Sequence, residues 1–591
     1  MSSEVPDRLL RVDLSVGAVE SESIPEPWRR KYVGGKGLGA RYLYEELDPG
    51  TGPLAPENRL LFLLGPLSGA LPGEGRYAAV TKSPLTGTFL DSYSGGRLPG
   101  ALRGSLGEHL GLLVEGRAEE PVRLVVEGGT ARIEPAETWG RDAAETCDAH
   151  DGVVACVGPA GESRVSYATI ASDRTEHHAG RGGAGAVMGS KRLKAVVAAD
   201  DPPEVPAALA ALRERDAEAF RETDTGRWLA ASGTLETVDF ADEAGVLAAR
   251  GWQERGFDGT DGVGVEAARE AASGRETDGD GDGDAELPGG FRIETPAGET
   301  IPRGATAMTL GAGLGLKEFD AVAELGERCN RLGVDLISAG NAVAWAIRAA
   351  DAGVIDRDIQ FSDPEGAREL LREIATRSTP LGDALADGVA TAAERLGGTG
   401  FVPTVKDMAL PAYDPRGAAS MALAYATSDR GACHRRARPV EREVFDDWGP
   451  QETAAAVIEA QDARSIRWSL IADDFVGEVL ADHGAEWLDA VGHPHEGDLQ
   501  RTGERIWNLV RLFNVREGFD RADDALPHGL EPGDALDPAE FEATLDRYYA
   551  ARGWGTDGRP SRDRLDELDL LGTVDGDTPM AEAPLRPESR P

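Results

Sequence analysis

The change of pattern at Asp201-Pro202-Pro203 constrains the fold of this chain more than any other feature of its sequence. Before this point short apolar runs alternate with clusters of glycine, proline and serine, and after it alanine, leucine, arginine and glutamate dominate. The apolar runs, each as long as one strand, are Leu9–Leu14, Leu60–Leu64, Tyr77–Val80, Val122–Val126 and Ala195–Ala199. The pattern predicts an α+β protein with a β-rich N-terminal domain followed by two mainly α-helical domains.

We place the domain boundaries at these changes of composition. The prediction is an N-terminal domain over 1–200, a helical middle domain over 201–400 and a helical C-terminal domain over 401–591. The stretches with helical composition are Pro206–Glu222, Glu318–Ala350, Pro364–Leu396 and Glu452–Leu480, some of them interrupted by Gly or Pro.

The charge balance excludes some classes of partner. The chain has 104 Asp+Glu against 62 Lys+Arg, a formal charge of −42, and only seven of its cations are lysines. Phosphate-rich partners need a basic face, so we expect no nucleic acid or membrane partner. An acidic, lysine-poor composition is typical of proteins from very salty cytoplasm, where about 1 M salt screens charges over roughly 3 Å. We therefore expect a halophilic, cytoplasmic protein.

The lack of a visible secretory signal and the pattern of cysteines agree with a cytoplasmic location. The first residues lack the basic and apolar regions of a secretory signal, and no apolar run reaches the roughly 18–20 residues that span a bilayer. The four cysteines, Cys147, Cys156, Cys329 and Cys433, form no CxxC pair. We expect free, buried thiols in a reducing compartment.

An acidic run at 277–286, TDGDGDGDAE, imitates the start of a calcium loop. An EF-hand loop that begins at Asp278 needs a bidentate Glu at its twelfth position, where this chain has Gly289. The run is therefore predicted to be a solvated surface loop.

Three glycine-rich segments of the first domain could bind an anion. They are Gly34–Gly39, the stretch from Arg76 to Gly96, and Ala179–Gly185. Each combines open backbone N–H groups with a nearby Lys or Arg, as an anionic cofactor requires. One such segment alone is better explained by tight turns, but three in one domain favour a shared anion site.

These segments, together with several motifs further along the chain, resemble the aldehyde ferredoxin oxidoreductase family. The further motifs are Val157–Glu162, Gly182–Lys191, Cys329–Asp335, Leu410–Gly417, Tyr425–His434, Arg505–Leu509, Arg516–Phe519 and Tyr548–Trp554. They run in order from about residue 7 to residue 571.

The resemblance implies a tungsten enzyme that oxidises an aldehyde with water to a carboxylic acid. In this family two pterin cofactors hold the metal without a protein ligand, on a β-rich base covered by helical domains, and a [4Fe-4S] cluster passes electrons to ferredoxin. The positions that match cofactor-binding residues are Arg76, Arg181, Gly182, Gly183, Asn330, Gly333 and Asp335. His434 matches a histidine near the metal and is the candidate catalytic proton carrier, with a hydrogen-bonded structural histidine as the alternative.

The chain departs from the family pattern at three places. The interval that should hold three cysteine ligands of the cluster, between 250 and 311, contains none, and the fourth ligand position is Asp473. In the second pterin loop Trp468 and Ile471 replace Asp and Gly, and Ala305 stands where the family has an active-site Glu.

Two functions therefore remain open. One is a divergent tungsten-bis-pterin oxidoreductase without its own [4Fe-4S] cluster. It would act on a small aldehyde and pass electrons to ferredoxin or another acceptor, and a homodimer is its expected assembly. The other is a non-catalytic relic of the family that binds a pterin or serves as a regulatory or assembly partner.

Overall fold

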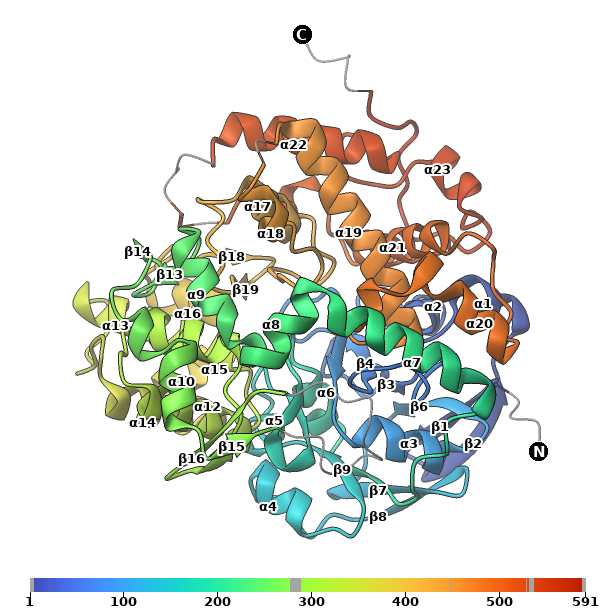
Figure 1. Ribbon diagram of the computed structural model, residues 1–591, viewed down its shortest axis with the longest axis horizontal. Coiled ribbons are helices and arrows are strands. Elements are labelled where there is room, and N and C mark those ends of the chain that lie inside the picture. Colours follow the sequence, from blue (N-terminus) through green and yellow to red (C-terminus); the bar gives the residue numbers. More distant parts are fainter. Residues whose placement is uncertain (1–4, 277–288, 447, 528, 531–535, 587–591) are drawn as a thin grey trace.

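Two six-stranded sheets form the N-terminal third of the protein in a computed structural model that describes residues 5–276, 289–446, 448–527, 529–530 and 536–586 (Figure 1). The first sheet has the order β2-β1-β6-β3-β4-β5 and the second the order β11-β10-β9-β12-β7-β8. Their strands are β1 (Arg8–Asp13), β2 (Ala18–Ser23), β3 (Leu60–Leu63), β4 (Tyr77–Lys82), β5 (Phe89–Ser94), β6 (His109–Glu115), β7 (Val122–Glu127), β8 (Thr130–Pro135), β9 (Val153–Cys156), β10 (Ile170–Ser172), β11 (His177–Ala179) and β12 (Leu193–Ala198).

Both faces of the first sheet are buried, which explains why its strands read as continuous apolar runs. Along β3, Leu60 and Phe62 pack into a core shared with the second sheet, whereas Leu61 and Leu63 pack into a core shared with C-terminal helices. Successive side chains of a strand point to opposite faces, so a strand between two cores needs apolar residues at every position. The five expected strands and the β-rich N-terminal domain are confirmed.

Helices make up most of the remaining chain. Those of the first 350 residues are α1 (Glu26–Tyr32), α2 (Gly35–Glu46), α3 (Leu98–Leu106), α4 (Ala143–Asp148), α5 (Pro159–Glu162), α6 (Ala184–Ser190), α7 (Ala207–Glu222), α8 (Asp224–Ser232), α9 (Glu236–Glu243), α10 (Val265–Ala271), α11 (Gly304–Thr306), α12 (Phe319–Leu332) and α13 (Leu336–Asp351). They are followed by α14 (Pro364–Thr376), α15 (Pro380–Ala386), α16 (Val389–Leu396), α17 (Ala419–Ala426), α18 (Val440–Glu443), α19 (Pro450–Leu470), α20 (Ala485–Val491), α21 (Leu499–Arg516), α22 (Pro538–Arg552) and α23 (Arg562–Glu567). Short hairpins, β13 (Ala248–Ala249) with β14 (Glu254–Arg255), β15 (Gly274–Arg275) with β16 (Phe291–Thr295) and β17 (Gly298–Thr300), and β18 (Thr404–Val405) with β19 (Met408–Ala409), lie between them.

The expected helical stretches are present but differ in extent. The stretch 318–350 is two helices, because Gly333 ends α12 in the left-handed conformation with φ +70°. The expected helix over 452–480 ends at Leu470: Ile471 takes the left-handed conformation, and Asp473 then accepts hydrogen bonds from the backbone N–H groups of the next turn. A side-chain acceptor of this kind competes with the helix for the backbone, and composition does not reveal it.

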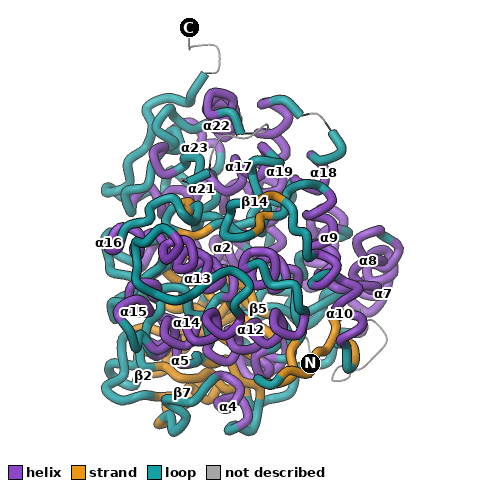
Figure 2. Tube along the Cα trace, turned by 90° about the vertical axis from the view of Figure 1, so that its left-hand side faces the viewer, coloured by secondary structure: helices purple, strands orange, loops and turns teal. Residues whose placement is uncertain are grey.

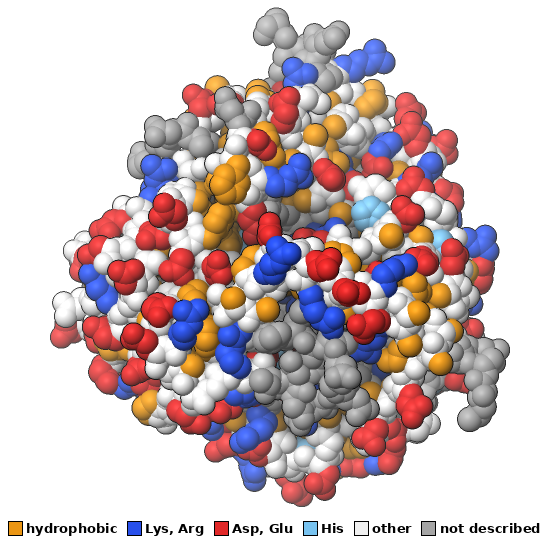
Figure 3. All heavy atoms as spheres, viewed as in Figure 1, with side chains coloured by type: hydrophobic (Ala, Val, Ile, Leu, Met, Phe, Trp, Pro, Cys, Tyr) orange, Lys and Arg blue, Asp and Glu red, His pale blue; other side chains and the backbone are white. Residues whose placement is uncertain are grey.

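The C-terminal helices lie against the N-terminal sheets rather than apart from them. Helices α2, α21 and α23 share one apolar core with the first sheet, and Figure 2 shows strands concentrated in the lower half of the molecule with α17, α19 and α22 above them. Acidic side chains outnumber basic ones on the face shown in Figure 3. Among the described residues no helix combines the length and the apolar character needed to cross a membrane. The acidic run 277–286 lies outside the described residues, and the domain boundaries near 200 and 400 stay predictions.

Candidate functional site

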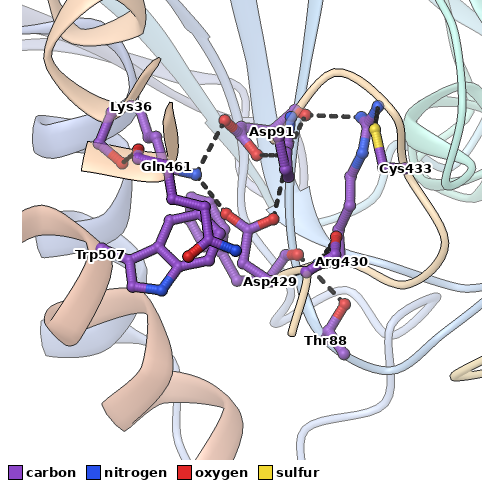
Figure 4. Close-up of polar contacts among 12 residues, drawn as sticks. Lys36, Thr88, Asp91, Asp429, Arg430, Cys433, Gln461 and Trp507 are labelled. Atoms are coloured by element: carbon purple, nitrogen blue, oxygen red, sulfur yellow. Dashed lines mark hydrogen bonds and ion pairs between the residues drawn. The ribbon is translucent and has the colours of Figure 1, made fainter. Parts of the chain in front are cut away.

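Four buried charged side chains meet where the first sheet contacts the C-terminal helices; we call them the central ion network (Figure 4). Lys36 Nζ lies 3.2 Å from Asp91 Oδ2 and 2.5 Å from Asp429 Oδ2. Arg436 Nε lies 2.7 Å from Asp429 Oδ1, and its guanidinium also binds Asp91. None of the four side chains is more than 3% exposed. Two cations and two carboxylates thus neutralise one another in the interior.

The network joins distant parts of the chain. Lys36 comes from the first turn of α2, Asp91 from β5, and Asp429 and Arg436 from the segment after α17. Burial alone would raise the pKa of Asp429, but Arg436 and Lys36 hold it well below its ordinary value. The sequence analysis missed all four residues. The available signal was Lys36 itself, one of seven lysines and placed inside a glycine motif.

Arg181, a predicted cofactor-binding residue, lies beside this network and is 5% exposed. Its Nη1 donates to the carbonyl oxygen of Ala432 at 2.6 Å, and its Nη2 donates to that of Ala409. Its Nε lies 3.5 Å from Asp335 Oδ2, but the buried Nε–H has no hydrogen-bond partner. Asp335 uses the same oxygen to accept the N–H of Ser338 and thereby caps α13. The structure therefore brings together Arg181 and Asp335, which the sequence separates by more than 150 positions.

The turn that follows Arg181 requires glycine. Gly182 and Gly183 have φ values of +99° and +88°, and a Cβ on Gly183 would lie 2.1 Å from the carbonyl oxygen of Ser166. The two predicted glycines thus shape the backbone around Arg181.

Arg430 lies next to Arg181 and lacks a carboxylate partner within the described part of the chain. Its Nη1 donates to the carbonyl oxygen of Asp91 at 2.8 Å, and its Nη2 lies 3.0 Å from the sulfur of Cys433 (Figure 4). Its Nε–H is buried without a partner. Burial would raise the pKa of Cys433, but Arg430, Arg436 and Arg181 lower it to about 7. The group carries more positive than negative charge unless Cys433 ionises or an anion binds.

His434, the predicted catalytic residue, follows Cys433 directly. The residue is partly exposed, whereas its Nδ1 is buried without a hydrogen-bond partner, and its ring centre lies 5.8 Å from that of Tyr413. Burial, together with the positive charges of Arg438 and Arg181, lowers the pKa of His434 well below 6.5. The imidazole is therefore neutral at pH 7, and its surroundings disfavour the protonated form.

Arg76 lies apart from Arg181 and contacts the other predicted loop. Its Nη2 lies 2.9 Å from Asp473 Oδ2 and 2.7 Å from Glu74 Oε2. The second oxygen of Asp473 accepts the backbone N–H groups of Phe475 and Val476 at 2.9 and 3.1 Å. Both oxygens of the carboxylate at the expected fourth cluster-ligand position are therefore used within the protein.

This ionic group extends to the start of the acidic run. His177 Nδ1 lies 2.9 Å from Glu74 Oε1, and Arg303 Nη1 lies 2.8 Å from Glu276 Oε2. Possible ligand atoms of Glu176, His177 and Glu276 lie within 4.8 Å of one another. However, Arg292 and Arg303 already neutralise the two carboxylates, so the arrangement does not favour a cation.

Asn330 lies in the last turn of α12 and points toward Glu327, and Gly333 caps the end of that helix. The Nδ2 of Asn330 lies 3.5 Å from Glu327 Oε2, and Thr175 Oγ1 lies 3.3 Å from Glu327 Oε1. Glu327 is 3% exposed, and burial raises its pKa to about 7 despite these hydrogen bonds. Of the predicted first pterin loop, only Asp335 contacts Arg181.

The substitution Glu327→Gln is expected to stabilise the protein at pH 8 by about 1–3 kcal/mol. The folded state keeps a proton on Glu327 up to about pH 7, whereas in the unfolded chain the pKa of this carboxyl returns to its ordinary value of 4.5. Stability of the wild type is therefore lost as pH rises from about 4.5 through 7. Urea denaturation at pH 4.5 and pH 8 measures this loss, which the variant should lack. An equal pH dependence in the variant would contradict the assignment.

The cysteines and the expected active-site Glu position agree with the departures seen in the sequence. Cys147, Cys156, Cys329 and Cys433 are buried and free, and the first two bring their sulfur atoms within 3.8 Å of each other. Ala305 lies in α11 and offers no carboxylate.

A small pocket of about 20 Å³, room for about one water molecule, lies between α13 and the segment that contains Ala412. Its wall is mostly apolar and includes Trp252, Met308, Thr309, Asn341 and Ala412. Asn341 accepts from the Trp252 indole and donates to two carbonyl oxygens, so its polar atoms are satisfied. Ala412 directly precedes Tyr413, whose ring neighbours His434. At that volume the pocket is too small for a substrate molecule in this conformation.

Comparisons with known protein families match almost the whole chain. Residues 9–200 match the N-terminal domain of aldehyde ferredoxin oxidoreductase, and residues 211–570 match its domains 2 and 3. A tungsten-containing aldehyde ferredoxin oxidoreductase from Pyrococcus furiosus is 33% identical over 95% of this chain and 98% of its own length. The protein of the same description from Thermococcus kodakarensis is 32% identical with the same coverage.

Two more distant matches share the fold. The WOR-like subunit of an aliphatic sulfonate oxidoreductase from Pyrococcus furiosus is 25% identical over 95% of this chain and 96% of its own. The solved active-site complex BamBC of benzoyl coenzyme A reductase, bound to 1,5-dienoyl-CoA, superposes with a TM-score of 0.82 at 22% identity, covering 97% of this chain and 98% of that one.

Proposed function

The chain belongs to the aldehyde ferredoxin oxidoreductase family, and from this premise we propose that it oxidises a small aldehyde to a carboxylic acid at a tungsten–pterin centre. The observation that carries the proposal is a set of three buried nitrogen atoms without hydrogen bonds, on residues close enough for their charges to interact. They belong to Arg181, Arg430 and His434. Buried polar groups are normally hydrogen-bonded, so these atoms point to a polar ligand.

The groups around Arg181 fit the anionic part of a pterin cofactor. Arg181 and Arg430 offer N–H donors, the Gly182–Gly183 turn exposes backbone, and Asp335 could accept from ring nitrogens. A phosphate would also balance the buried charge of Arg430, which would otherwise be costly. When bound, the metal centre would accept the two electrons that leave the aldehyde.

His434 would handle the proton of the reaction. Oxidation of an aldehyde with one water releases two protons and two electrons, so a proton acceptor near the substrate is needed. We assign this role to His434, which is neutral at pH 7 and whose Nδ1 has no hydrogen-bond partner among the described residues. Because Ala305 replaces the expected Glu, His434 would act without a carboxylate partner at that position. We place the aldehyde next to His434, near the ring of Tyr413.

A [4Fe-4S] cluster does not fit the described residues. Asp473 is held by Arg76 and two backbone N–H groups, and carboxylates are poor ligands for such clusters. The four cysteines lie elsewhere: Cys147 and Cys156 contact each other, and Cys433 contacts Arg430. We derive no electron-transfer step through a cluster, and ferredoxin or another acceptor would take electrons by a different route.

The metal content of protein purified in high salt, combined with a dye-reduction assay, tests the proposal. We expect tungsten or molybdenum near one atom per chain, little iron, and aldehyde-dependent reduction of a viologen dye. Four irons per chain would contradict the argument against a cluster. Protein without tungsten, molybdenum or pterin, and without turnover, would contradict the proposed activity.

A second candidate is a non-catalytic relic that binds a pterin or assists a related protein. The observation that favours it is the combined loss at Ala305 and Asp473, which removes an acid/base group and a cluster ligand. Measurable aldehyde turnover would exclude this candidate. A homodimer stays an expectation for either function, and sedimentation would test it.

A further inference from the structure

Trp468, the third-last residue of α19, occupies the loop that the resemblance assigns to a second pterin. The indole is 1% exposed, and its ring centre lies 4.9 Å from that of Tyr93, with 29° between the planes. The guanidinium of Arg436 lies 4.5 Å from the ring centre, and the Nε1–H donates to Asp474 at 2.8 Å. The indole is thus held by stacking, by a cation over the ring and by an edge hydrogen bond. A flat nitrogen heterocycle would be held by the same three contacts.

The backbone around Trp468 packs closely against the start of α2. A Cβ on Gly35, at the start of α2, would lie 2.2 Å from the carbonyl oxygen of Trp468 and 2.5 Å from Ile471 Cδ1. Ile471 itself has φ +59°, a conformation that a β-branched residue rarely adopts. Gly34 and Gly35 therefore allow close packing against the end of α19, a role that differs from the tight turns expected for this segment alone. Ile471 is fixed where the family has Gly.

The carboxylates at this end of the site all have partners in the described structure, and the Nε–H groups of Arg438 and Arg467 are buried without a hydrogen bond. Asp474 binds Arg435 and Trp468, Asp473 binds Arg76, and the central ion network is internally neutral. The Arg181 end differs, because an uncompensated guanidinium remains there together with unpartnered N–H donors. The Arg181 end therefore has N–H donors for an anionic ligand. At the Trp468 end the charged groups already neutralise one another.

We propose that Trp468, with Tyr93 and Arg436, replaces the second pterin, so that the chain binds no more than one pterin, at Arg181 and Asp335. The binding of one pterin at Arg181 and Asp335 rests on the proposed function. The occupation of the second site by Trp468 does not. Trp468 fills the second pterin site whether or not a pterin binds at the first.

The number of pterins per chain tests the inference without an activity measurement. Protein made in a host that supplies the tungsten cofactor is denatured and oxidised, and the released fluorescent pterin is counted against protein. We expect no more than one pterin per chain. Two pterins per chain would overturn the inference while leaving the proposed function intact. No pterin at all would count against the proposed function but not against the role of Trp468.

A cavity-making variant tests whether the indole fills a heterocycle site. Trp468→Ala is expected to bind 6-carboxypterin and to gain about 3 °C in Tm at a hundredfold excess over Kd, whereas the wild type gains nothing. Trp487→Ala is the matched control, because Trp487 is equally buried and also donates its Nε1–H to an aspartate, Asp216, in another part of the molecule. Equal stabilisation of wild type and Trp468→Ala, or of both variants, would overturn the assignment. Should Trp468→Ala not fold, the pterin count of the wild type still decides.

Discussion

Replacing Lys36 by methionine is expected to lower the free energy of unfolding by about 3–5 kcal/mol, because it leaves two buried carboxylates to share one guanidinium. Lys36 Nζ contacts both Asp91 and Asp429, and none of these side chains reaches water to an appreciable extent. Methionine keeps the length of the side chain, so the lost charge dominates over lost packing. Urea denaturation at pH 7 measures the change.

The control for this variant is Lys317→Met. Lys317 Nζ lies 2.8 Å from Asp258, but the two side chains are 43% and 73% exposed. Exposed pairs contribute at most about 1 kcal/mol and are screened by salt. The Lys36→Met effect should persist in molar salt, whereas any Lys317→Met effect should vanish. A loss below about 1 kcal/mol for Lys36→Met would contradict the arrangement of the central ion network.

Replacing His434 by glutamine is expected to lower aldehyde-dependent dye reduction by about 10²–10⁴-fold, the range typical for loss of a general acid or base. Glutamine keeps a polar side chain of similar reach but cannot take up a proton. Metal and pterin content, measured on the same samples, should be unchanged. A loss of cofactor would instead assign His434 a structural role.

The pH dependence of the rate supplies a second readout. The pKa of His434 lies well below 6.5, so the imidazole stays neutral, and activity is retained, as pH falls to 6.5. The acidic limb of the wild-type profile should therefore lie below pH 6.5 and be absent in His434→Gln. His483→Gln changes a histidine of the 3-10 turn before α20 and serves as control. An unchanged acidic limb in His434→Gln would rule out this histidine as its source.

Local pattern and family resemblance together predicted much of the fold. Continuous apolar runs such as Leu60–Leu64 marked strands between two cores, and the change after Pro203 marked the start of the mainly helical part of the chain. Helix ends were harder to predict, because Ile471 and Asp473 end α19 through conformation and side-chain acceptance that composition does not encode.

The candidate site was predictable only in part. Matched motifs placed Arg181 and Asp335 together, and the structure gives them a direct contact. The same motifs predict Asn330 at the cofactor, which stays a prediction, and its amide lies 3.5 Å from Glu327. The pairing of Lys36 with Asp429 spans 393 positions, and no local pattern can reveal a contact of that separation.

That separation has a consequence for how the chain is made. Lys36 of α2 and Asp91 of β5 are synthesised early, but Asp429 and Arg436 emerge from the ribosome only when the chain has grown past Arg436. Until then Lys36 lacks Asp429 and Asp91 lacks Arg436. The ion network of the N-terminal third therefore stays incomplete while the following helices are translated. The first sheet and the C-terminal helices are in this sense one folding unit, whose buried ion network forms only late in synthesis.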